Sequence, residues 1–161
     1  RDLKTHNVLK AFNGAMKLCD FGLVRIRNTR AGTPAYMAPE LIEGKSFNRS
    51  VDVFAFGVFL NELFTQRIPF YGVPIEELRE RVVEGDRPPL ATWGNPRIVQ
   101  MITKCWHVDP DERMEFTEIV DELIDVLDNT KEHSCTEEVK LSDGQYEGDA
   151  LDILMTPRTG K

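Results

Sequence analysis

Several common features are absent from the 161 residues, and each absence excludes a class of protein. No run of about 20 apolar residues occurs, which argues against a membrane-spanning helix in this stretch. The three cysteines form no Cys-x-x-Cys pair, so reduced thiols of an intracellular, cytoplasmic protein fit them better than disulfides or a zinc site. The chain also begins with Arg rather than Met, and we expect it to be a piece of a longer protein.

Positive charge is scarce in the last third of the chain. Residues 1–108 contain 15 basic and 11 acidic side chains, whereas residues 109–161 contain 5 basic and 16 acidic ones, and the net charge is −7. A nucleic-acid-binding surface needs clustered basic residues, so we expect no nucleic-acid partner. Residues 129–161 are acidic and poor in aromatic residues, which predicts a disordered tail.

A β-hairpin is predicted near the N-terminus. Val8–Lys10 and Met16–Cys19 are short strand candidates on either side of Asn13-Gly14, a dipeptide whose residues both accept a positive φ. Such a hairpin would bring Asn7, just before its first strand, close to Asp20, just after its second.

The rest of the pattern predicts helices, and the fold class is therefore mainly α. Pro39 opens a short helix over residues 40–43 that Gly44 closes, and Ser50 is expected to cap a long buried helix reaching Thr65. Further helices are predicted over residues 74–84, 98–105 and 117–128. The stripe expected to dock the last helix comprises Phe116, Ile119, Val120, Leu123, Ile124 and Leu127.

Four polar residues near the N-terminus have the side chains that phosphoryl transfer requires. That reaction needs oxygen ligands for Mg²⁺ on the nucleotide phosphates, a carboxylate that orients the attacking hydroxyl, and a cation near the transferred group. Asp2, Lys4, Asn7 and Asp20 supply these types. Taken singly, each is an ordinary surface residue, so only their joint occurrence in order carries the hypothesis.

The order of these residues resembles that of eukaryotic protein kinases. Asp2-Leu3-Lys4-Thr5-His6-Asn7 is similar to the catalytic loop, Asp20-Phe21-Gly22 to the metal-binding loop, and Gly32-Thr33-Pro34 through Ala38-Pro39-Glu40 to the end of the activation segment. Asp52 to Gly57, Cys105-Trp106 and Arg113 resemble parts of the large-lobe helices. The chain looks most like the tyrosine-kinase-like group of serine/threonine kinases. The resemblance implies that residues 1–128 form the large (C-terminal) lobe, a helical bundle with a small β-hairpin.

The resemblance also implies roles for the active-site residues. Asp2 would orient the hydroxyl of a protein substrate, and Lys4 would neutralise the γ-phosphoryl group of ATP. Asn7 and Asp20 would be the Mg²⁺ ligands. Thr33 would hydrogen-bond near Asp2 and Lys4 and form the floor of the substrate pocket.

Three further residues have structural roles by the same resemblance. Glu40 and Arg113 would form a buried ion pair that ties the activation segment to the last helices, and Asp52 would accept backbone N–H bonds from the catalytic loop.

Two hypotheses rest on residues near these motifs. Thr29 is the only hydroxyl between Gly22 and Gly32 and is surrounded by arginines, so we hypothesise that its phosphorylation orders the loop and activates the parent protein; a merely solvated basic loop is the alternative. Cys19 is either an accessible thiol at the nucleotide site or, as we favour, a buried inert one.

The nucleotide-binding half of a kinase is not found in this sequence. No two glycines lie two positions apart, so a glycine-rich phosphate loop is missing, as are the strand lysine and its glutamate partner. We expect the small N-terminal lobe to lie outside residues 1–161 and this stretch alone to be inactive. The alternatives are a non-catalytic kinase-like scaffold and a small-molecule phosphotransferase.

Overall fold

The computed structural model describes residues 1–22 and 32–134. These residues form five α-helices, three short 3-10 helices and one two-stranded sheet. In chain order the elements are η1 (Thr5–Asn7), β1 (Val8–Lys10), β2 (Met16–Leu18), η2 (Pro34–Tyr36), α1 (Pro39–Glu43), α2 (Ser50–Thr65), α3 (Ile75–Val83), α4 (Pro96–Cys105), η3 (Pro110–Glu112) and α5 (Phe116–Ser134). The predicted fold class, mainly helical with a small hairpin near the N-terminus, is confirmed.

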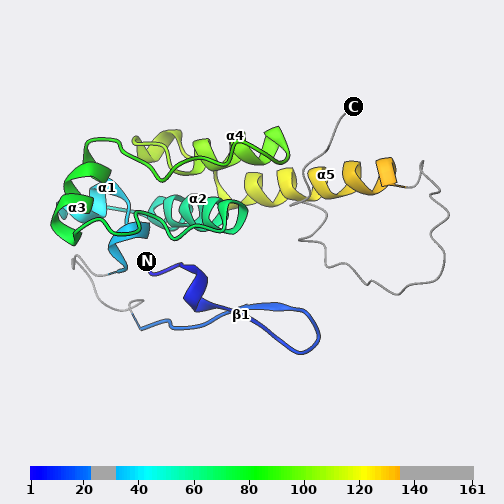
Figure 1. The fold of residues 1–161 in the computed structure, drawn as a ribbon, viewed down its shortest axis with the longest axis horizontal. Helices are drawn as coiled ribbons and strands as arrows, with labels where there is room; N and C mark the ends of the chain where they lie inside the picture. The colour runs from blue at the N-terminus through cyan, green and yellow to red at the C-terminus, as the bar shows by residue number, and fades with distance from the viewer. Residues whose placement is uncertain (23–31, 135–161) are drawn as a thin grey trace.

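Helix α2 is the centre of the structure. Figure 1 shows α4 on one side of α2, the hairpin on the other, and α1 with α3 near one end. Side chains are buried on nearly every face of α2, as predicted, among them Val53, Phe54, Val58, Leu60 and Phe64. A helix that is apolar all round is stable in water only when other elements cover it. Helix α4 and the 3-10 helices η2 and η3 pack directly against α2 and provide part of this cover.

Helices α2 and α4 approach closely at Gly57. A Cβ atom on Gly57 would lie 2.9 Å from Cys105 Cβ and 3.2 Å from the Trp106 backbone nitrogen. Gly57 therefore lets the two helices come nearer than any larger residue allows. Burial raises the pKa of the Cys105 thiol to about 12, so this thiol is an inert core group.

The hairpin forms with the predicted strands but with a different turn. β1 and β2 are antiparallel and pair Val8 with Leu18 and Lys10 with Met16. Within the turn only Gly14 has a positive φ, of 81°, and its backbone nitrogen donates to the Ala11 carbonyl. This is a three-residue loop that ends in a left-handed glycine, whereas the sequence predicted positive φ at Asn13 as well.

Most helix boundaries differ from the prediction by one or two residues, and the end of α5 differs by more. Ser50 is the first residue of α2 rather than its cap, and the Asn48 side chain accepts the Ser50 backbone N–H at 2.7 Å instead. Helix α5 continues past Asp128 to Ser134, so it crosses the predicted boundary between lobe and tail. Side-chain bonds from Asn129 and Thr130 to carbonyls one turn earlier accompany this extension. The disordered tail stays a prediction, because residues 135–161 lie outside the described residues.

The apolar stripe of α5 is only partly buried. Ile119 and Val126 are each 1% exposed, whereas Phe116, Val120 and Ile124 are 38%, 51% and 52% exposed. The prediction that this stripe docks was therefore wrong for Val120 and Ile124, whereas Phe116 packs its ring against that of Phe56 on α2, with a centroid distance of 5.8 Å. Apolar residues along α5 form two neighbouring lines with the same helical spacing. The sequence pattern does not distinguish them, and only packing decides which line faces the core.

A buried ion pair connects α1 to the segment that precedes α5. Arg113 Nη1 and Nη2 donate to the two carboxylate oxygens of Glu40 at 2.7 and 2.9 Å, and the Arg113 side chain is 0% exposed. Arg113 also donates to the Ser50 carbonyl at the start of α2. The Arg113 guanidinium lies over the Phe54 ring. The Arg87 guanidinium also lies over this ring, 4.8 Å from its centroid.

We expect Arg113→Met to lower the free energy of unfolding by about 3–5 kcal/mol, because it leaves the Glu40 carboxylate buried without a partner. Urea titration of the chain measures this change. Arg49→Met is the matched control, since Arg49 pairs with Glu115 on the surface and its side chain is 80% exposed. The control should change stability by less than about 1 kcal/mol. Equal losses of stability in Arg113→Met and Arg49→Met would show that the Glu40–Arg113 pair does not act as a buried ion pair.

Gly57→Ala should destabilise the chain by about 1–3 kcal/mol, because the added methyl group collides with α4. Helix propensity acts in the opposite direction and favours alanine by about 1 kcal/mol. The sign of the change is therefore decisive. A stabilised variant in thermal or urea unfolding would show that the helices are not in close contact here.

Candidate active site

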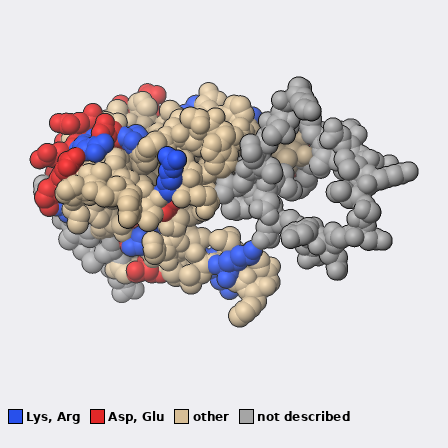
Figure 2. Space-filling view, viewed as in Figure 1, with Lys and Arg blue, Asp and Glu red and all other residues tan. Residues whose placement is uncertain are grey.

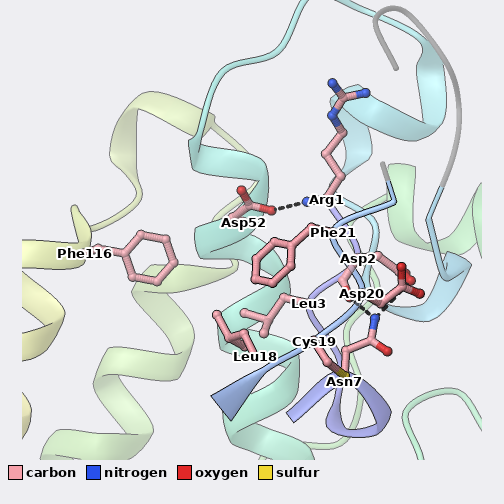
Figure 3. Close-up of a pocket in the computed structure, with 10 residues that line it drawn as sticks. All are labelled: Arg1, Asp2, Leu3, Asn7, Leu18, Cys19, Asp20, Phe21, Asp52 and Phe116. Carbon is pink, nitrogen blue, oxygen red and sulfur yellow. Dashed lines mark hydrogen bonds and ion pairs between the residues drawn. The ribbon is translucent and has the colours of Figure 1, made fainter. Parts of the chain in front are cut away.

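Residues from four parts of the chain, including Asp52 of α2, line one cavity of about 280 Å³. Asp2 and Asn7 come from the N-terminal segment, Asp20 follows β2, and Phe116 comes from the start of α5. Figure 3 shows Asp2, Asn7 and Asp20 grouped on one side of this cavity, with Phe116 on the other. The hairpin causes this grouping, because its ladder continues through a bond from the Cys19 nitrogen to the Asn7 carbonyl at 2.9 Å.

Both oxygens of the Asp2 carboxylate are held by neighbouring groups. Oδ1 accepts the backbone N–H of Thr33 at 2.9 Å and the Thr33 hydroxyl at 2.7 Å. Oδ2 contacts Lys4 Nζ at 2.9 Å and Asn7 Nδ2 at 3.2 Å. Lys4 Nζ in turn donates to Thr33 Oγ1 at 2.7 Å. The four residues therefore form one closed network around the carboxylate.

This network also sets the charge state of Asp2. Burial favours the neutral acid, but the hydrogen bonds from Thr33 and Lys4 and the charge of Lys4 outweigh it and lower the pKa of Asp2. The carboxylate therefore stays ionised at neutral pH. Its stabilising effect on the fold is present above the ordinary value of 3.8 and is lost as the pH falls through the lowered pKa.

Asn7 and Asp20 present oxygens that fit a magnesium ion. Asn7 Nδ2 donates to the Asp2 carbonyl at 2.8 Å and to its carboxylate, which leaves the Asn7 amide oxygen as a remaining acceptor. The exposed Asp20 carboxylate accepts one bond, from the Gly22 nitrogen at 3.2 Å. Amide and carboxylate oxygens are ligands that Mg²⁺ prefers, and it keeps water or phosphate oxygens in its other positions.

Asp20 has an unusual backbone conformation. Its φ of 60° lies in the left-handed region, which only a few per cent of non-glycine residues adopt, although aspartate is among the more tolerant. This conformation comes directly after the ladder ends at Cys19, and it turns the chain at the cavity. Phe21, which follows, lines the same cavity and is 67% exposed.

Asp52 connects α2 to the N-terminal segment. Its Oδ1 accepts a hydrogen bond from the terminal ammonium of Arg1 at 2.6 Å, and the two charges form an ion pair (Figure 3). The Arg1 guanidinium lies over the Phe47 ring at 4.9 Å. Both contacts hold the residue next to Asp2 in place.

One contact of the site could not be read from the sequence. The Tyr36 hydroxyl donates to the Glu62 carboxylate of α2 and lies 3.5 Å from Thr5 Oγ1. Burial and the bond to Glu62 raise the pKa of the Tyr36 phenol. The pair fixes η2, and with it Thr33, on the central helix. No local pattern relates the two residues, because they lie 26 positions apart.

The two hypotheses about neighbouring residues have different outcomes. Cys19 is half-buried and lines the cavity, so the favoured alternative of a buried inert thiol was wrong. The neighbouring Leu18 is likewise uncovered, at 57% exposed. Thr29 lies outside the described residues, and its phosphorylation stays a hypothesis.

Comparison with known proteins identifies the family. Residues 1–123 match the family model described as protein tyrosine and serine/threonine kinase. The chain therefore belongs to the protein kinase family, and the described helices and hairpin correspond to the large lobe predicted from the motifs.

Several kinases are similar to the chain. It is 38% identical to dual specificity protein kinase shkC of Dictyostelium discoideum over 138 residues, which cover 79% of this chain and 27% of that protein. It is 33% identical to serine/threonine-protein kinase STY46 of Arabidopsis thaliana over 133 residues, which cover 78% of the chain and 23% of the relative. The chain is 35% identical to serine/threonine-protein kinase STY17 of the same plant over 130 residues, which cover 76% of the chain and 23% of that protein. The chain thus spans about a quarter of the length of these relatives.

Thr33→Val should raise the pKa of Asp2 toward its ordinary value, because the variant removes the hydroxyl bond at 2.7 Å and keeps the backbone one. The carboxyl resonance of Asp2, followed by NMR as the pH is lowered, measures the change. Thr103→Val is the matched control, since its hydroxyl bonds only the Val99 carbonyl on the surface of α4. An Asp2 titration that is unchanged in Thr33→Val would contradict the network.

Proposed function

We propose that this chain is the large lobe of a serine/threonine protein kinase, which transfers the γ-phosphoryl group of ATP to hydroxyl groups of protein substrates with Mg²⁺. The observation that carries this proposal is the Asp2 carboxylate held ionised at the same cavity as the amide oxygen of Asn7 and the carboxylate of Asp20. Phosphoryl transfer depends chiefly on such positioning and on charge neutralisation.

Asp2 orients the attacking hydroxyl in this proposal. Its lowered pKa makes it a weak proton acceptor, so it contributes more by accepting a hydrogen bond and aligning the oxygen than by removing the proton early. Lys4 places a positive charge beside it for the transferred group. When bound at Asn7 and Asp20, Mg²⁺ would neutralise charge on the nucleotide phosphates.

The preference for serine and threonine rests on Lys4 and Thr33. Their contact at 2.7 Å, together with the bonds from Thr33 to Asp2, makes the floor of the substrate pocket part of the catalytic network. Two similar plant proteins are named serine/threonine kinases, while the Dictyostelium relative is named a dual specificity kinase. Membership of the tyrosine-kinase-like group is part of the same proposal.

Activity in this proposal requires a small ATP-binding lobe outside residues 1–161. The apolar side chains of the hairpin support this, because Leu9, Met16 and Leu18 are each more than half exposed. We retain the division into a lobe and an acidic tail, with the boundary moved to the end of α5. Among the described residues, no helix is both long and apolar enough to cross a membrane. A cytoplasmic location stays a prediction.

The alternative is a kinase-like scaffold without catalysis. A scaffold needs neither an ionised carboxylate at the cavity nor magnesium ligands beside it, so the complete set of Asp2, Lys4, Asn7 and Asp20 favours an enzyme.

Asp2→Asn should lower phosphoryl transfer by about 10²–10⁴-fold, because the amide keeps the shape of the side chain and loses the charge that aligns the hydroxyl. The measurement is incorporation of labelled phosphate from ATP into a protein substrate, with the full-length protein that contains this chain. Asp121→Asn on the exposed face of α5 is the matched control and should retain activity within about twofold. Equal incorporation by Asp2→Asn and the unmodified protein would favour the scaffold.

A further inference from the structure

A second concave surface lies where the loop after α2 meets α3. It has a volume of about 600 Å³, and its lining includes Arg67, Ile68, Phe70, Tyr71, Arg81 and Arg87. We call it the arginine groove. Binding pockets typically measure about 300–1,000 Å³, so the groove is large enough to receive side chains of a partner. None of its residues belongs to the candidate active site.

The loop that forms the groove is held in a strained conformation. Only three non-glycine residues in the described part of the chain have a positive φ: Asp20 at the active site, and Gln66 and Phe70 at the groove. Gln66 ends α2, where a left-handed residue is common. Phe70 has no such reason, and a bulky residue with a φ of 55° is an outlier of the kind that gathers at functional sites.

This loop leaves two large apolar side chains uncovered. Ile68 is 62% exposed and Tyr71 is 83% exposed, and both line the groove. Tyrosine is enriched where proteins bind one another, because it offers contact area at a small cost in conformational entropy.

The charge of the groove is opposite to that of the chain. Its lining contains three arginines and no Asp or Glu, while the chain carries a net charge of −7. Figure 2 shows Asp and Glu gathered at the end of the molecule where α3 lies. Arg81 is already paired with Asp86 at 2.8 Å and Glu77 at 3.6 Å.

The other two arginines differ in what they can offer a partner. Arg87 donates to backbone carbonyls, including that of Trp106 at 2.9 Å. Arg67 is exposed and forms no hydrogen bond or ion pair within residues 1–22 and 32–134. Arg67 is therefore the charge that remains available to a partner.

We propose that the arginine groove binds a segment of a partner protein in which an acidic side chain stands beside a large apolar one. The carboxylate pairs with Arg67, and the apolar side chain packs against Ile68 and Tyr71. This binding is independent of phosphoryl transfer and needs no ATP, so its failure would leave the proposed kinase function untouched.

The test uses a fluorescein-labelled peptide in which two glutamates flank a Phe-Leu pair, titrated with the full 161-residue chain and followed by fluorescence anisotropy. Arg67→Glu should weaken binding by about tenfold or more, because it replaces attraction by repulsion. Arg49→Glu makes the same charge change on an exposed arginine outside the groove and should leave binding unchanged. A peptide with lysines in place of the glutamates should not bind.

The apolar half of the groove has its own pair of variants. Tyr71→Ala should weaken binding by roughly tenfold, whereas Ile75→Ala, which alters a 55% exposed side chain outside the groove lining, should not. Circular dichroism confirms that each variant is folded, which is expected because the altered side chains are exposed. Absent binding, or equal losses in a variant and its control, would overturn the proposal.

The acidic tail of the chain is the competing occupant. Asp149→Asn with Asp152→Asn removes two of its charges and should leave the affinity for the peptide unchanged. A tenfold gain in affinity would assign the groove to the tail and overturn the assignment to a partner protein.

Discussion

The buried pair of Glu40 and Arg113 is the contact on which the rest of the structure depends. Glu40 lies on α1, a few residues after Thr33, so holding this carboxylate also limits where the segment that carries Thr33 can lie. Arg113 reaches the start of α2 as well, and α2 carries the Asp52 that holds the backbone of Arg1. Because one charge without the other would be buried uncompensated, the pair acts as a strict positional constraint. The two segments that build the active site are thereby fixed to one scaffold.

That scaffold explains how a small group of polar residues becomes a site. Asp2 alone is an ordinary acidic residue, but Thr33 brings two donors to one of its oxygens and Lys4 brings a charge to the other. The same carboxylate orients Asn7, and the amide oxygen of Asn7 remains as an acceptor at the cavity. Protein kinases act chiefly by placing charges and reacting groups. A closed hydrogen-bond network achieves this by holding the side chains in fixed positions.

Strained backbone occurs at both surfaces that we associate with binding. Asp20 turns the chain beside the cavity. Phe70, in the loop after α2, lines the arginine groove. Neither conformation is favourable for an isolated residue, and each persists because its surroundings over-determine it. The described part of the chain therefore has two places where a non-glycine residue with positive φ lies beside exposed functional side chains, and these are the two surfaces to which we assign the proposed phosphoryl transfer and the proposed partner.

Local sequence determined the hairpin, most helix positions and the family, because turn residues, helical periods and ordered motifs are short-range signals. It placed Asp2, Lys4, Asn7 and Asp20 together through the hairpin and the family resemblance. Tertiary structure decided what depends on packing: Ile119 and Val126 of α5 face the core and Phe116 packs against Phe56, while Val120 and Ile124 stay exposed. The bond of Tyr36 to Glu62 joins residues that are distant in sequence, and the arginine groove likewise has Arg67 and Arg87 in one lining. Such contacts have no local signature, because they depend on how complete elements pack together.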